Sequence, residues 1–88
     1  MEPDTAAVLR DLGRRIAELR RARGLTQEKA AERLGMLAPN YARIEQGRLN
    51  VTVDTLVRVV RMLGDGVTIA DLFAPPAATE QRSGETPK

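Results

Sequence analysis

Residues Thr26 to Gly47 read TQEKAAERLGMLAPNYARIEQG, and the rest of the chain is organised around this stretch. Thr26 is a good helix N-cap, because its hydroxyl can accept a hydrogen bond from an open N–H of the first turn. The apolar residues Ala30 and Leu34 share one face of the helix that follows, and Gly35 supplies the left-handed residue that ends it. The pattern predicts a short helix that leads into a tight turn.

A second helix is expected after this turn. Pro39 lies in its first turn, where a missing N–H costs little, Tyr41 and Ile44 share its inner face, and Gly47 ends it. The small alanines of the preceding helix let the two helices cross closely. An ordinary helical hairpin explains any one of these features, but their combination in one frame favours a helix-turn-helix arrangement.

Apolar residues at helical spacing predict three further helices. One precedes the motif, from about Val8 to Arg23. Another follows it, with Thr52 or Asp54 near its cap. Its expected buried residues are Val53, Leu56, Val57, Val60 and Leu63. The short segment VTIADLF, residues 67–73, predicts a last helix capped by Thr68.

We expect one small all-α domain between two tails. Residues 1–7 are polar and predict a flexible N-terminal tail, whereas residues 8–73 form the helical domain. From 74 to 88 the chain is rich in Pro, Ala, Ser, Thr and Gly without a periodic apolar face, which predicts a disordered C-terminal tail.

The composition excludes several kinds of site. With no Cys and no His among its 88 residues, the chain offers no disulfide, no ordinary zinc site and no thiol or imidazole catalysis. Its carboxylates are scattered and it has no Gly-rich phosphate loop, so we expect no enzyme, cofactor or small-molecule ligand. No apolar run approaches the roughly 20 residues that cross a bilayer, and the acidic N-terminus lacks signal-peptide features, which predicts a cytoplasmic protein without a membrane partner.

The net charge of +2 is unevenly distributed. Residues 8–63 contain 12 basic and 6 acidic residues, while both ends of the chain are acidic on balance. Nearly all the basic residues are Arg, whose planar guanidinium suits phosphate and guanine. The helical body is therefore the part that favours an anionic partner.

Three segments carry a resemblance to a known family. The run LGRRIAELRRARGLTQEKAAERLG, followed by YARIEQG and TVDTLVRVVRMLG, resembles the Cro/repressor-type (XRE-family) helix-turn-helix proteins over about Leu12 to Phe73. The resemblance implies a five-helix, lambda-repressor-like fold, with the helix-turn-helix formed by helices 2 and 3, in a regulator that binds double-stranded DNA. It also implies an ion pair between Arg20 and Glu45, for which two solvated surface charges are the alternative interpretation.

If the third helix enters the major groove, its exposed residues can reach base edges. By donor and acceptor geometry Arg43 suits guanine, and Asn40 suits adenine or a phosphate. Ala38 and Pro39 offer only shape and contact with a thymine methyl group. The family usually has polar residues at the positions of Leu37 and Ala38, where this chain has apolar ones. The weight of base reading therefore shifts to Arg43 and to the shape of the DNA.

Phosphate contacts are expected on both sides of the third helix. Gln27 resembles the family's phosphate clamp, next to Thr26 and the open N–H groups that begin the second helix. Gln46, Arg48 and Asn50 flank the other side. Ordinary solvated polar residues are the alternative reading of these positions.

One domain of this kind covers few base pairs, so we expect a homodimer on a near-palindromic operator, as in short phage repressors and restriction-modification controllers. The last helix is the candidate dimer surface, because it is unusually apolar for its length. The residues concerned are Val67, Ile69, Leu72 and Phe73. The alternative is that they cap the core. A different function, as an antitoxin or partner-binding module, also stays open.

Overall fold

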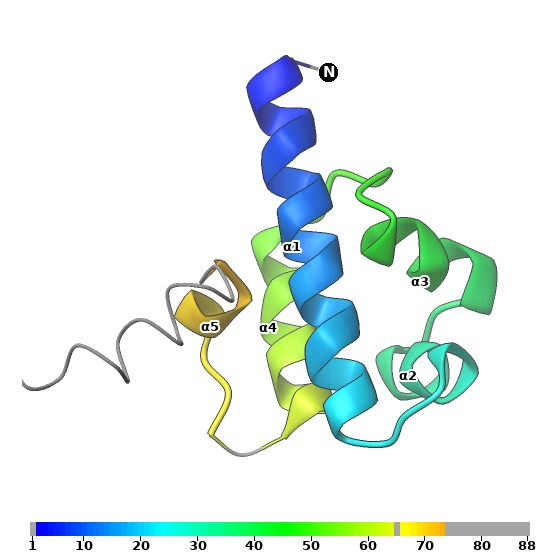
Figure 1. Ribbon diagram of the computed structural model, residues 1–88. Helices are drawn as coiled ribbons and strands as arrows, with labels where there is room; N and C mark the ends of the chain where they lie inside the picture. The colour runs from blue at the N-terminus through cyan, green and yellow to red at the C-terminus, as the bar shows by residue number, and fades with distance from the viewer. Residues whose placement is uncertain (1, 65, 74–88) are drawn as a thin grey trace, which may run out of the picture.

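The computed structural model describes residues 2–64 and 66–73, so the predicted tail over 74–88 lies outside the described residues. The helices are α1 (Pro3–Ala22), α2 (Gln27–Leu34), α3 (Ala38–Glu45), α4 (Val53–Leu63) and α5 (Ile69–Phe73). Figure 1 shows α2 and α3 on one side of the long α1 and α5 on the other. α1 packs against α3 and α5, and α4 packs against α2 and α5. The predicted all-α, five-helix fold is confirmed for the described part of the chain.

The first helix is longer than the apolar pattern predicts. It begins at Pro3, not near Val8, so the expected flexible tail over residues 1–7 is wrong for most of its length. Proline is favoured in a first helical turn, and the negative charge of Asp4 interacts favourably with the positive end of the helix dipole. Pro3 and Asp4 lie ahead of the buried apolar stripe of α1, which begins only at Leu9.

α2 and α3 form the predicted helix-turn-helix. Thr26 Oγ1 accepts a hydrogen bond from the N–H of Lys29 at 3.0 Å, and Gly35 ends α2 with φ 69°. Pro39 lies in the first turn of α3, as expected. Leu37 is the N-cap of α3, and its side chain makes no capping hydrogen bond.

The core is built from one face of each helix. Its buried apolar residues are Leu9, Leu12, Ile16, Ala17, Ala30, Ala31, Leu34, Tyr41, Ile44, Leu56, Val59, Met62, Leu63 and Leu72. The predicted buried face of α4 is partly wrong, because Val53 is exposed whereas Val59 and Met62 are buried. The apolar stripe of α4 is so wide that spacing alone does not identify its centre. Among the described residues, no helix has the length and apolar character needed to cross a bilayer.

Two sets of hydrogen bonds anchor α5. The hydroxyl of Thr68 accepts from the N–H of Asp71 at 3.2 Å, and the Asp71 carboxylate accepts from the N–H of Thr68 at 2.8 Å. This reciprocal pair is a capping box. Arg15 of α1 donates from Nε to the Asp71 carbonyl at 3.0 Å. The short terminal helix is therefore fixed on α1.

α1 crosses the end of α3 at Gly13. A Cβ on Gly13 would lie 2.4 Å from the carbonyl oxygens of both Ile44 and Glu45. Only glycine permits so close an approach, because any other residue would clash with backbone atoms that cannot rotate away. Gly13 therefore determines how deeply α3 sits against α1.

We expect Gly13→Ala to destabilise the fold. Alanine gains about 1 kcal/mol of helix propensity over glycine at an open position. Overpacking of a close crossing costs about 1–3 kcal/mol or more, which outweighs that gain. Urea unfolding measures the difference, and Arg14→Ala at the neighbouring exposed position is the control. A Gly13→Ala protein more stable than the wild type would contradict the close crossing.

Candidate nucleic-acid interface

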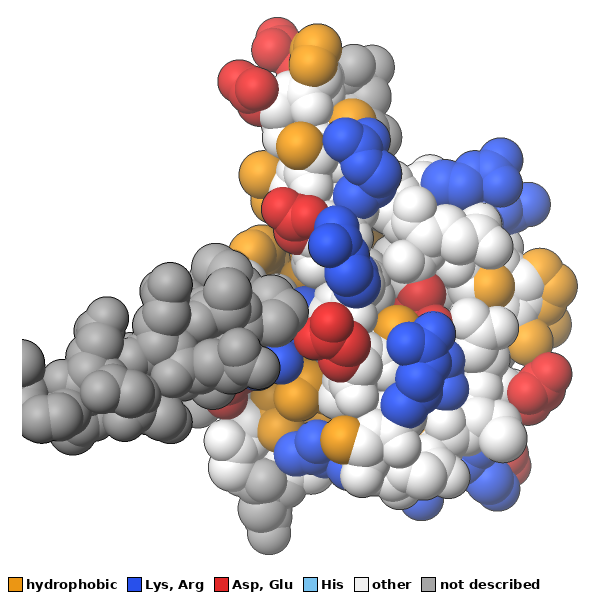
Figure 2. Space-filling view, viewed as in Figure 1, with side chains coloured by type: hydrophobic (Ala, Val, Ile, Leu, Met, Phe, Trp, Pro, Cys, Tyr) orange, Lys and Arg blue, Asp and Glu red, His pale blue; other side chains and the backbone are white. Residues whose placement is uncertain are grey.

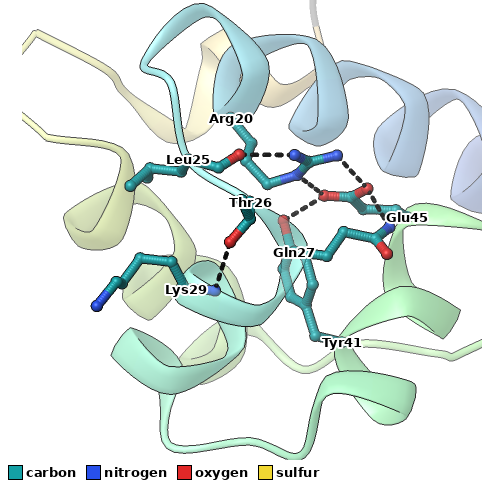
Figure 3. Close-up of polar contacts among 7 residues, drawn as sticks. All are labelled: Arg20, Leu25, Thr26, Gln27, Lys29, Tyr41 and Glu45. Carbon is teal, nitrogen blue, oxygen red and sulfur yellow. Dashed lines mark hydrogen bonds and ion pairs between the residues drawn. The ribbon is translucent and has the colours of Figure 1, made fainter.

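A buried polar cluster joins the helix-turn-helix to α1 (Figure 3). Arg20 donates from Nε and Nη2 to the two carboxylate oxygens of Glu45 at 2.6 and 3.1 Å, so the ion pair implied by the family resemblance is present. Arg20 Nη1 donates to the carbonyl of Leu25 at 2.7 Å. Gln27 Nε2 donates to the same carboxylate at 2.8 Å, and the Tyr41 hydroxyl also donates to it. One carboxylate thus links α1, α2 and α3.

The charges of this cluster compensate one another. The side chains of Arg20 and Glu45 are only 8% and 5% exposed. Burial would raise the pKa of Glu45, but hydrogen bonds from Arg20, Tyr41 and Gln27 outweigh burial and hold this pKa below its ordinary value. Burial and the hydrogen bond to Glu45 raise the pKa of Tyr41. Near neutral pH the cluster is therefore an ion pair with a neutral tyrosine, and it fixes the orientation of α3.

The cluster predicts a loss of stability in acid. The pKa of Glu45 is lower in the folded chain than its ordinary value of 4.5, so its stabilisation is complete above that pH and is lost as the pH falls through the folded value. Thermal unfolding at a series of pH values, from neutral down through the folded pKa of Glu45, measures this loss of stability. Glu45→Gln should start less stable at neutral pH and lose less on acidification. Parallel pH profiles for the two proteins would contradict this assignment.

The predicted base-reading residues differ in exposure. Arg43 and Pro39 are exposed, whereas Asn40 is half-buried. Arg43 Nη1 donates to Asn40 Oδ1 at 3.0 Å, so these two polar residues form one unit. Ala38 is half-buried and packs against the core, which leaves it little surface for a ligand. Leu37, the N-cap of α3, was not among the predicted base-reading residues, yet its side chain is 72% exposed.

The predicted phosphate contacts fall into two groups. The Thr26 hydroxyl is used as the cap of α2, and one amide N–H of Gln27 is used by the buried carboxylate. Gln46, Arg48 and Asn50 are exposed, and Arg48 Nη1 donates to Gln46 Oε1 at 3.4 Å. Gln27 thus has a structural role that sequence spacing did not reveal, because its partner lies 18 residues away.

The four residues predicted to form the dimer surface fall into a buried and an exposed group. Leu72 is fully buried and Val67 packs against the core, so these two belong to the monomer, as the alternative interpretation of this helix expects. Assigning Leu72 to a dimer surface is therefore wrong, because α5 turns this side chain inward. Ile69 and Phe73 are 36% and 48% exposed and remain available.

Basic side chains lie on the same face as the motif. Figure 2 shows Lys and Arg along α1 and beyond the end of α3. Arg10 and Arg14 of α1 and Arg48 in the loop after α3 are exposed. This face of the molecule therefore favours a polyanion.

The helical body of the chain matches a known family. A family model described as a helix-turn-helix domain matches residues 11–71. The chain belongs to this family of non-enzymatic, DNA-binding transcriptional regulators and is of the XRE type.

HTH-type transcriptional regulators are similar to this chain. It is 38% identical over 68 residues to the uncharacterized HTH-type transcriptional regulator y4dJ of Sinorhizobium fredii, covering 77% of this chain and 86% of y4dJ. It is 28% identical over 69 residues to the HTH-type transcriptional regulator PuuR of Escherichia coli, covering 78% of this chain but only 36% of PuuR.

Solved structures agree with this assignment. The restriction-modification controller protein C.AhdI from Aeromonas hydrophila superposes with a TM-score of 0.72 at 31% identity, covering 80% of this chain and 99% of the controller. The hypothetical transcription factor NHTF from Neisseria superposes with a TM-score of 0.76 over 92% of this chain and 91% of its own. Its identity of 22% supports the fold alone.

Proposed function

We propose that the chain is a sequence-specific transcriptional regulator that binds a near-palindromic operator as a homodimer, with α3 in the major groove. The observation that carries the proposal is the buried Arg20–Glu45 cluster, which holds α3 rigidly while leaving Arg43 exposed. A recognition helix must be held rigidly, because base contacts depend on hydrogen-bond donors placed to within a fraction of an ångström.

Arg43 is the principal base contact in this proposal. Its guanidinium can donate two parallel hydrogen bonds to the O6 and N7 atoms of guanine, which no other base pair accepts in the same arrangement. Asn40 already accepts a hydrogen bond from Arg43 and so restricts its rotamers. Asn40 therefore acts either as a positioning residue for Arg43 or as a second contact.

Phosphate contacts fix the register of α3 on the duplex. Arg48 and Asn50, both exposed in the loop after α3, supply side-chain donors on one side. On the other side, the open backbone N–H groups at the start of α2 favour an anion, and Gln27 retains a second amide N–H. These contacts carry no sequence information and serve every duplex alike.

The proposed dimer uses the exposed part of α5. Phe73→Asp is expected to give a folded monomer, because its half-exposed side chain contributes little to the core while a charge would oppose an apolar contact. Light scattering measures the mass, and Val53→Asp on α4 is a control at another exposed apolar site. A Phe73→Asp protein that remained a dimer would rule out α5 as the interface.

Selection of bound duplexes from a random DNA pool tests the proposed function. We expect the pool to converge on a site with two inverted halves, about one helical turn apart from centre to centre. Convergence on an asymmetric site would contradict the two-fold dimer. Failure to converge on any sequence would contradict sequence-specific binding.

A further inference from the structure

The start of α3 is apolar and exposed, unlike the starts of two other helices. α2 and α4 begin on threonines, Thr26 and Thr52, whose hydroxyls accept N–H groups of the first turn. α3 begins on Leu37, which accepts none and is 72% exposed, and Pro39 beside it is also exposed. Figure 2 shows hydrophobic side chains at the outer edge of the molecule beside α3.

Leucine is a poor choice here for folding. A Ser, Thr, Asp or Asn in this position would satisfy an open N–H of α3, and a polar side chain would not present apolar surface to water. Ala38, by contrast, packs against the core, and this contact accounts for its apolar side chain. A residue such as Leu37, which departs from the N-cap preference without a benefit to folding, is typical of a binding surface.

We infer that Leu37 reads the C5-methyl group of thymine, an inference that rests on the proposed function. Among the groups that base pairs present in the major groove, the thymine methyl is the apolar one. Arg43 lies six residues after Leu37. At about 1.5 Å per residue the two lie roughly 9 Å apart along the helix, too far to read one base pair. α3 therefore has an apolar end for thymine and a polar end for guanine.

Replacing thymine by deoxyuridine tests this inference, because it removes only the methyl group. The probe is the duplex selected from the random pool, substituted at one symmetric pair of thymines at a time. We expect one pair at which uracil weakens wild-type binding about four-fold for each methyl group lost. In the Leu37→Ser protein the thymine and uracil duplexes should bind equally.

The Leu37→Ser protein also separates the effect of Leu37 on base recognition from its effect on folding. Serine can cap α3, so Leu37→Ser should raise Tm by about 4–8 °C while its affinity for the thymine duplex falls. Val53→Ser is the matched control, because Val53 is 73% exposed but begins α4. The Val53→Ser protein should keep the wild-type ratio of affinities for thymine and uracil duplexes.

Two results would overturn the inference while leaving the proposed function intact. In one, wild-type protein binds the selected duplex tightly but is indifferent to uracil at every position. In the other, Leu37→Ser discriminates thymine from uracil as well as the wild type does. A wild-type protein with no preference for any duplex would instead overturn the proposed function, and the inference with it.

Discussion

Glu45→Ala is expected to lower the free energy of unfolding by about 3–5 kcal/mol, the cost of breaking a buried ion pair by removing one partner. Arg20 would stay buried with the Leu25 carbonyl as its remaining acceptor in the cluster. Tyr41 and Gln27 would lose the same acceptor. Since small domains are stable by only about 5–15 kcal/mol, this loss would leave the chain marginally folded.

Urea unfolding followed by circular dichroism measures this loss. Glu32→Ala is the matched control, because Glu32 pairs with Lys29 at 3.2 Å between two exposed side chains, an interaction worth about 0.2–1 kcal/mol. The double variant of Arg20 and Glu45 should lose less stability than the sum of the two single changes, since both remove one shared interaction. Equal midpoints for Glu45→Ala and Glu32→Ala would contradict the structural role of the cluster.

Arg43→Ala is expected to weaken binding to the selected duplex by about 1–3 kcal/mol at each half-site. The side chain is exposed and bonds only to Asn40 in the described part of the chain, so the variant should fold normally. The loss should be confined to one base pair of each half-site, where the variant accepts all four bases. Titration against duplexes that carry each base at that position measures it.

Arg48→Ala is the matched comparison, because it shows how the loss of a phosphate contact differs from the loss of a base contact. Arg48 is an exposed arginine just beyond α3, proposed to contact phosphate. Its loss should weaken every duplex alike and reduce the slope of affinity against salt by about one. If Arg43→Ala behaved in the same way, Arg43 would be a phosphate contact and not a base contact.

The helices and several of their ends could be predicted from the sequence, because the signals that determine them are local. Thr26 and Thr52 cap the helices that follow them, and Gly35 ends α2 in the left-handed region. Each depends on atoms within one helical turn. The pairing of Arg20 with Glu45 is not local, and only the resemblance to a family indicated it.

What the sequence did not reveal depends on contacts between distant segments. Gly13 reads as a weak helical residue until α3 is packed against it. Leu72 and Phe73 are neighbours of similar character, yet α5 buries the first and exposes the second. Gln27 looks like a surface amide, but its partner comes from the far end of α3. Spacing within one helix cannot distinguish these roles.

Sequence reading by α3 is tested most directly by one ratio, that of the wild-type dissociation constants for a scrambled duplex and for the selected duplex of the same length and composition. At physiological salt we predict a ratio of at least about 1,000, the lower end for specific regulators. A ratio near one, with binding that disappears as salt rises, would mean that the basic face binds any polyanion, and would contradict sequence reading by α3.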